Sequence, residues 1–254
     1  KIPSNLNADM KTDFVFLDYG EHDYENYRNL MGGSIIVAIS KKDGSYSVRK
    51  LRSPNNLWHH GVTVDFEGDG DMDIIATGGP EPSKFTQNTH LFLNDGAGNF
   101  NHQVLYNIDV DGGTYSVGAS DLFGDKSDEI VFGNTSGAGA LVTIMSEGNI
   151  IQRYKLRKYG RWTIPDLFFH DVDKDGNKDI VLVLADYNFR SKSSVLSNVH
   201  HALLMKNGKI QKEETIFSGG RNLVGKDLFG NVVSCGREIV ILNKKRTRFW
   251  VLNR

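Results

Sequence analysis

A short acidic loop that returns along the chain is the feature that most restricts its fold. In the stretch DFEGDGDMDII at 65–75, acidic residues occupy every second position of nine and apolar residues follow at once. The stretch DVDKDGNKDIV at 171–181 has the same frame, and partial copies begin at 5, 121 and 227. Five copies at intervals of 50 to 60 residues predict repeated structural units.

The same order of elements follows each copy. A short β-rich run comes after the loop, then a polar connection, then a hairpin with Asp-Gly, Glu-Gly or Asn-Gly at its turn, and then a strand that leads into the next loop. Four short antiparallel strands per repeat, without helical periodicity, are typical of β-propeller blades. We therefore predict an all-β chain with one propeller domain over 1–254. Its five repeats either close by themselves or belong to a six- to eight-bladed ring.

Composition excludes some partners. The net charge is −1, which favours neither nucleic acid nor an anionic membrane surface as a partner. The longest apolar run, 180–185, has the length of a strand, so no membrane insertion is expected. The single cysteine, Cys235, has no partner for an internal disulfide, and we interpret it as an inert thiol. The basic run 244–248 is interpreted as a charged turn.

The acidic loops have the pattern of a calcium site. Ca²⁺ binds six to eight oxygen atoms in flexible geometry, and these loops offer side-chain oxygens at positions one, three, five and nine and a backbone carbonyl at position seven. Glycine at the sixth position, Gly70 or Gly176, permits the sharp turn. An EF-hand is excluded because its twelfth position requires Glu, and here that position is Ala76 or Leu182. Purely polar turns are the alternative interpretation.

Calcium is therefore the expected cofactor, in three of the loops. The predicted ligands are Asp65, Glu67, Asp69, Asp71 and Asp73; Asp171, Asp173, Asp175, Asn177 and Asp179; and Asn5, Asn7, Asp9, Lys11 and Asp13. The loops at 121 and 227 have lost ligands, the first of them to Phe123, and are predicted to be metal-free. Affinities typical of extracellular modules, roughly 10⁻⁴–10⁻³ M, favour a secreted or cell-surface protein.

The two full loops resemble those of FG-GAP/VCBS repeats, the blades of integrin α subunits and of many secreted bacterial proteins. The hairpin LFLNDGAGNF at 91–100 is similar to the one that follows such loops. This resemblance covers essentially the whole chain, most clearly 60–106 and 165–217. It implies the propeller fold and calcium, whereas the family's functions range over adhesins, lectin-like proteins and domains of polysaccharide lyases.

Long connections are expected at the end of the sheets opposite the acidic loops, and long loops on a rigid scaffold often bind ligands. The candidate ligand-binding residues there are Tyr24, Tyr27, Arg28, Trp58, Arg161, Trp162, Tyr187 and Arg190. For Trp58 and Trp162, packing between blades is the alternative interpretation and the favoured one. The adjacent histidines His59-His60 and His200-His201 do not predict zinc, because neighbours on a strand point to opposite faces.

Three functions stay open at this point. The favoured one is an extracellular binding module for a glycan or a protein ligand, since the sequence contains no nucleophile elbow, phosphate loop or zinc motif. The second is a polysaccharide lyase or glycoside hydrolase that acts on an acidic polysaccharide. The third is a structural piece of a larger adhesin.

Overall fold

The computed structural model describes most of the chain. It covers residues 1–18, 20–21, 31–53, 57–79, 88–105, 114–136, 139–159, 162–187, 195–219, 232–235, 238–242 and 249–252. These residues form strands and turns, and none of them belongs to a helix long and apolar enough to cross a membrane.

Four antiparallel sheets of four strands follow one another along the chain, which confirms the all-β prediction and the four strands per repeat. Sheet 1 contains β1 (Ile2–Ser4), β2 (Asp13–Leu17), β5 (Ile35–Ser40) and β6 (Tyr46–Lys50). Sheet 2 contains β7 (Leu57–Val64), β8 (Asp73–Gly79), β9 (Asn88–Asn94) and β10 (Phe100–Val104). Sheet 3 contains β11 (Thr114–Ser120), β12 (Glu129–Ser136), β13 (Gly139–Ser146) and β14 (Asn149–Lys155). Sheet 4 contains β15 (Thr163–His170), β16 (Asp179–Tyr187), β17 (Val195–Lys206) and β18 (Lys209–Gly219).

Two smaller units complete the described strands. A two-stranded ribbon pairs β3 (Gly20–Glu21) with β4 (Met31–Gly32), within the connection between β2 and β5. Sheet 5 has three strands, β19 (Val232–Cys235), β20 (Glu238–Leu242) and β21 (Phe249–Leu252).

The loop prediction for the fifth repeat is wrong in part. The partial copy that begins at 227 predicts a loop up to Glu238, but residues 232–235 form β19 and pair with β20. The β-branched pair Val232 and Val233 favours a strand, and the alternating acidic ligands that would oppose one are missing there. The strand that is expected to lead into this copy, NLVGKDL at 222–228, lies outside the described residues.

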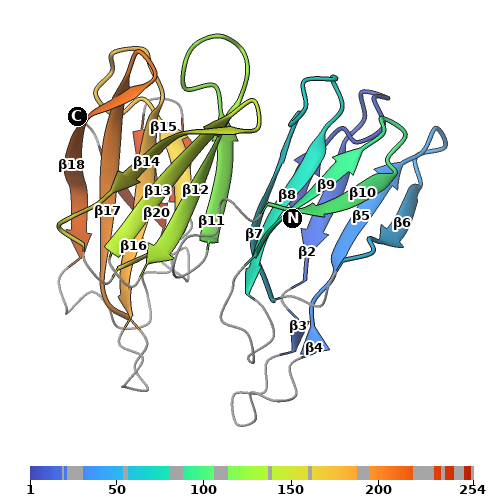
Figure 1. Ribbon diagram of the computed structural model, residues 1–254, viewed down its shortest axis with the longest axis horizontal. Helices are drawn as coiled ribbons and strands as arrows, with labels where there is room; N and C mark the ends of the chain where they lie inside the picture. The colour runs from blue at the N-terminus through green and yellow to red at the C-terminus, as the bar shows by residue number, and fades with distance from the viewer. Residues whose placement is uncertain are drawn as a thin grey trace.

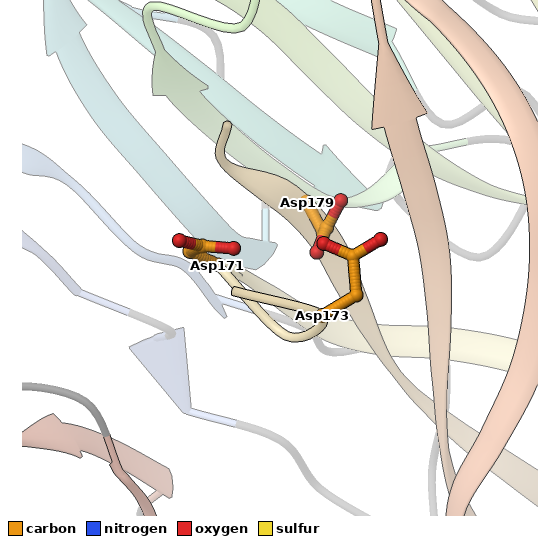
Figure 2. Close-up of side chains that lie close together, drawn as sticks. All are labelled: Asp171, Asp173 and Asp179. Carbon is orange, nitrogen blue, oxygen red and sulfur yellow. The ribbon is translucent and has the colours of Figure 1, made fainter. Parts of the chain in front are cut away.

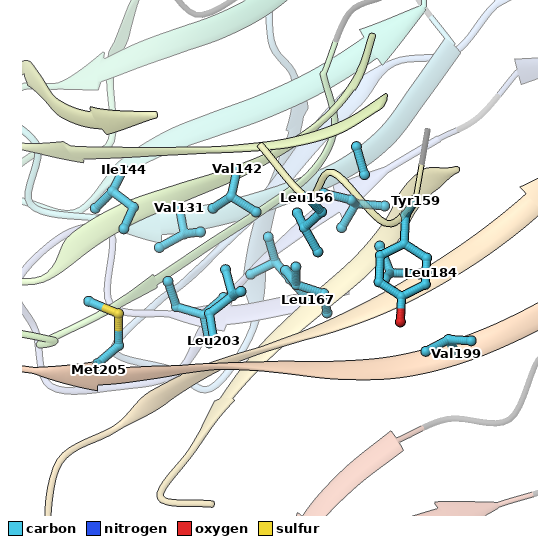
Figure 3. Packing of buried hydrophobic residues seen from close by; sticks show 14 of the residues in the cluster. Val131, Val142, Ile144, Leu156, Tyr159, Leu167, Leu184, Val199, Leu203 and Met205 are labelled. Carbon is cyan, nitrogen blue, oxygen red and sulfur yellow. The ribbon is translucent and has the colours of Figure 1, made fainter. Parts of the chain in front are cut away.

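Apolar side chains fill the spaces between consecutive sheets. Leu6, Val15 and Val37 of sheet 1 meet Trp58 and Phe92 of sheet 2. Figure 3 shows the largest cluster, where Val131, Val142 and Ile144 of sheet 3 face Leu184, Leu203 and Met205 of sheet 4. The central strand β16 is buried on both faces, with Ile180 and Leu182 toward sheet 3 and Val181 on the opposite side. Such strands require a neighbouring layer on each side, as in a stack of blades.

The first strands of the sheets come together. β11 contacts both β7 and β15, and Figure 1 shows β7 and β11 near the middle of the molecule. Hydroxyl groups cap the carbonyls of these edge strands: Thr77 Oγ1 donates to Tyr115 O (3.1 Å), and Ser116 Oγ donates to Ile164 O (2.8 Å). Packed sheets lie about 10 Å apart. Yet His60 of sheet 2 lies 3.2 Å from Asp166 of sheet 4, so sheets 2 to 4 converge at their first strands. We refer to this stack of converging sheets as the fan.

The described sheets leave one outer face uncovered. Phe16 and Val48 of sheet 1 are exposed on the side away from sheet 2.

Candidate metal centre

Four acidic loops, each between the first and second strands of a sheet, share one backbone conformation. The fourth residue has a positive φ in every loop, at Ala8 (54°), Gly68 (74°), Gly124 (76°) and Lys174 (62°). The sixth residue also does so, at Met10 (60°), Gly70 (92°), Lys126 (80°) and Gly176 (92°). The turn expected at the sixth position is confirmed, whereas the one at the fourth was not anticipated. Because non-glycine residues adopt it too, side-chain hydrogen bonds must help to impose this shape.

The first residue of the loop folds the backbone around its carboxylate. Asp65 Oδ1 accepts hydrogen bonds from the N–H groups of Gly68 (2.9 Å) and Asp69 (3.1 Å), and its Oδ2 accepts one from Gly70 (3.0 Å). Asp171 accepts from Asp175 and Gly176, both at 3.0 Å. These charge-assisted bonds satisfy the turn's donors before any ion is considered.

The ninth residue is a buried clamp. Asp179 Oδ2 accepts the N–H of Val172 (2.8 Å) in the loop, and Oδ1 accepts the N–H of Met205 (2.7 Å) on the third strand. The same arrangement recurs at Asp13 and Asp73, and Glu129 supplies the carboxylate in sheet 3. These four carboxyl groups are buried, so each loop is joined to its own sheet from within.

Burial also perturbs the acidity of two clamps. It raises the pKa of Asp179 to about 6, although the hydrogen bonds from Met205 and Val172 oppose the shift. The pKa of Asp73 is raised to about 6 for the same reason. A cation close to either group would favour its ionised form.

In the loop at 171, three carboxylates converge. Asp171, Asp173 and Asp179 each place one oxygen atom within 4.8 Å of the others, and Figure 2 shows the three side chains around the turn. Asp173 is exposed, Asp171 is half-buried and Asp179 is buried, so the group opens to solvent on one side. Three hard oxygen donors with open access suit Ca²⁺, which completes its shell with carbonyls and water. Among the described residues no second group of this kind occurs.

Two other predicted ligands in that loop bond to each other. Asp175 Oδ1 accepts hydrogen bonds from the backbone N–H and the Nδ2 of Asn177, both at 2.9 Å. The bond from the backbone N–H of Asn177 is the main reason that the pKa of Asp175 is lowered. Asp175 is not part of the group of three converging carboxylates.

The loop at 65 places its carboxylates differently. Asp65, Glu67 and Asp69 are exposed, and the clamp Asp73 lies beneath them. The Asp71 carboxylate lies against Gly96 in the β9–β10 hairpin. These five residues keep the calcium pattern but do not show the convergence found at 171.

The loop at 5 is closed by hydrogen bonds with sheet 1. Lys11 Nζ donates to Lys41 O (2.8 Å), Asn7 Nδ2 donates to Ser40 O (3.4 Å), and Asp9 accepts the N–H of Lys11 (2.9 Å). Asn5 stands at the first position, where the other loops have Asp. An ammonium group on the seventh residue supplies positive charge here, so this loop has less need of an ion than the loop at 171.

Most of the candidate ligand-binding residues lie outside the part of the chain that the structure describes. Tyr24, Tyr27, Arg28, Arg161 and Arg190 lie outside the described residues. Tyr187 ends β16, and its side chain is likewise not described.

The prediction that Trp58 binds a ligand is wrong. Its side chain is 2% exposed in the core between sheets 1 and 2, edge-on to His90 with ring centres 5.1 Å apart, so it cannot reach a surface ligand. Trp162 is partly buried and packs on Tyr159 at 5.1 Å, beside the core between sheets 3 and 4. Packing between sheets was the alternative considered for both tryptophans, and an aromatic residue at the start of a first strand enters the space between two sheets.

No family model matches the chain, and no curated protein matches it either. The resemblance to FG-GAP/VCBS repeats thus stays an interpretation of the loop motifs.

Proposed function

We propose that this chain is an extracellular, calcium-stabilised β-propeller module that binds a glycan or a protein ligand at the end opposite its acidic loops. The observation that carries the proposal is the convergence of Asp171, Asp173 and Asp179 in a loop whose conformation recurs in four sheets. An ion bound there would hold the end of β15, the start of β16 and, through the clamp to Met205, the strand β17.

Contacts between neighbouring sheets extend this effect. The ring of Phe66 in sheet 2 lies against Gly148 in the β13–β14 hairpin, and the ring of Phe123 in sheet 3 lies against Gly208 in the β17–β18 hairpin. Asn94 Nδ2 of sheet 2 donates to Leu6 O in the loop of sheet 1 (2.8 Å). The acidic loops of sheets 1, 2 and 3 therefore pack on the hairpin of the following sheet. Sheet 4, which carries the loop at 171, is joined to sheet 3 through its own β17–β18 hairpin.

The proposal includes closure of the sheets into a ring, and the convergence of their first strands supports it. Either the five repeats close by themselves, or they belong to a ring of six to eight blades. The outer face of sheet 1 is the open side that a closing blade would cover.

Ligand recognition is assigned to the opposite end, where the connections after the second strands and between the sheets lie. Tyr24, Tyr27, Arg28, Arg161, Tyr187 and Arg190 are the residues proposed to take part. Aromatic rings stack on sugar rings, and arginine binds carboxylates in two-pronged fashion, so acidic glycans fit this set best. A binding role is preferred to catalysis because the sequence carries no recognisable catalytic motif.

Two measurements test the proposal. Thermal unfolding in calcium and in EGTA should differ, because an ion that binds only the folded chain stabilises it. A glycan array probed with and without calcium should show retention of specific glycans without product. Identical melts would refute the calcium role. Reducing ends or unsaturated uronates released over time would replace binding by catalysis.

A further inference from the structure

Where the first strands converge, a histidine of one sheet meets an aspartate two sheets away. His60 lies on β7, Val117 on β11 and Asp166 on β15. The Nδ1 atom of His60 lies 2.9 Å from the carbonyl oxygen of Val117, and its Nε2 lies 3.2 Å from Asp166 Oδ1. The side chains of His60 and Asp166 are 32% and 49% exposed, so both are partly open to solvent.

The donors and acceptors of this contact can be counted. A carbonyl oxygen only accepts hydrogen bonds, so Nδ1 of His60 carries the proton that points to Val117. In a neutral imidazole, Nε2 then presents a lone pair to an oxygen of Asp166, which is also an acceptor. Two facing acceptors require a cation between them, either a second proton or a metal ion. Donation by the remote ring nitrogen to a backbone carbonyl is also how metal-binding histidines are usually oriented.

Two other histidine contacts do not pose this problem. His90 Nδ1 and His102 Nε2 lie 2.8 Å apart, and two neutral rings satisfy each other when one donates and the other accepts. His201 Nε2 lies 3.3 Å from Glu213, while its Nδ1 faces the hydroxyl of Thr215, which is able to donate. Neither contact needs an added cation, and His102 therefore serves as a control.

We propose that His60 Nε2 and Asp166 Oδ1 bind a first-row divalent metal ion, best Zn²⁺, at the centre of the fan. Nitrogen and oxygen ligands at about 2.0–2.2 Å from a tetrahedral zinc lie about 3.4 Å from each other, close to the 3.2 Å observed. Imidazole suits zinc, nickel and copper, whereas Ca²⁺ takes oxygen ligands, so this site differs in chemistry from the acidic loops.

A second imidazole lies in the same row of sheet 4. His200 on β17 pairs with Val183 on β16, which in turn pairs with Asp166, so His200 and Asp166 share one face of the sheet. The remaining coordination positions are left to water or to an external ligand.

Calorimetric titration with zinc chloride tests the site. Calcium is kept saturating, so that the carboxylate loops are occupied throughout. We expect one zinc ion per chain in the wild type, and at least tenfold weaker binding in His60→Gln and in Asp166→Asn. Glutamine retains a donor for the Val117 carbonyl, and both side chains are partly exposed, so both variants should fold; melts without zinc check this. His102→Gln should bind zinc like the wild type.

Cobalt provides an independent readout. Co²⁺ in place of zinc should give the intense visible absorption of a tetrahedral site in the wild type and not in His60→Gln. The proposal is overturned when the wild type takes up no zinc, which would mean that a proton bridges the two side chains. It is equally overturned when His60→Gln and Asp166→Asn keep the wild-type affinity.

Discussion

The buried carboxylate of Asp179 is a structural clamp and, in the proposed calcium site, also a metal ligand; a second clamp in the chain serves as a control that separates the two roles. Glu129 occupies the same ninth position in the loop at 121, is equally buried and accepts the N–H of Leu122 (2.8 Å), but its loop lacks the converging carboxylates. We therefore compare Asp179→Asn with Glu129→Gln. Each amide keeps one acceptor oxygen and places an NH₂ group where the second oxygen accepted a hydrogen bond.

The expected magnitudes differ between EGTA and calcium. In EGTA Asp179→Asn should lose about 1–3 kcal/mol of unfolding free energy, because one backbone N–H loses its acceptor. Glu129→Gln should lose less, because its amide NH₂ can donate to the Ser146 hydroxyl, which donates to Oε1 in the wild type. In calcium at about 100 times the dissociation constant, a bound ion adds about 2.7 kcal/mol to the stability of the wild type. Glu129→Gln should keep this increment and Asp179→Asn should lose most of it. For a chain of this size, the increment corresponds to a shift of about 5–10 °C in the melting temperature.

Urea unfolding in the two buffers, followed by tryptophan fluorescence, measures both the loss of stability in EGTA and the increment that calcium adds. Trp58 is buried between sheets 1 and 2 and should report the loss of packing there. The reasoning fails if Glu129→Gln loses the calcium increment as fully as Asp179→Asn, because the ion would then not act through the converging carboxylates. It also fails if Asp179→Asn responds to calcium like the wild type.

Three further predictions concern the scaffold. Met10 is 93% exposed with φ 60°, so Met10→Gly should raise stability by about 0.5–1 kcal/mol in urea melts, whereas Gly70→Ala, at φ 92° with open space around it, should lower it by a similar amount. In Gly118→Ala the new Cβ would lie 2.7 Å from Leu167 of the next sheet, and a loss of about 1–3 kcal/mol is expected in the same assay. Burial, with a smaller effect from His102, lowers the pKa of His90 to about 4. Below pH 6.5 the unfolded chain therefore binds more protons than the folded chain, and the free energy of unfolding decreases as the pH is lowered. At pH 5 this amounts to about 2 kcal/mol, and a pH series of urea melts should show that His90→Gln escapes that part of the loss.

The repeat could be predicted from the sequence because its signals are local. Alternating carboxylates, Asp-Gly turns and β-branched runs each act within a few residues, and the strands of sheets 1 to 4 follow them. The positive φ of Lys174 and Met10 was hidden, because hydrogen bonds around the loop override the preference of the side chain. Trp58 was ambiguous because burial depends on the neighbouring sheet. The contact of His60 with Asp166 joins residues more than a hundred positions apart, and only the curvature of the fan brings them together.

The loops also explain why some copies can lose ligands without losing the fold. The loop at 121 has Phe123 at the third position, yet it keeps the buried clamp, the positive φ values and the packing on the next hairpin. Those three features are made by hydrogen bonds and apolar contact, which need no ion. Calcium at 171 would then be added to a turn that is already formed, so its removal should lower the melting temperature without unfolding the chain. A chain that unfolded outright in EGTA at room temperature would show instead that the ion is required to build the loop.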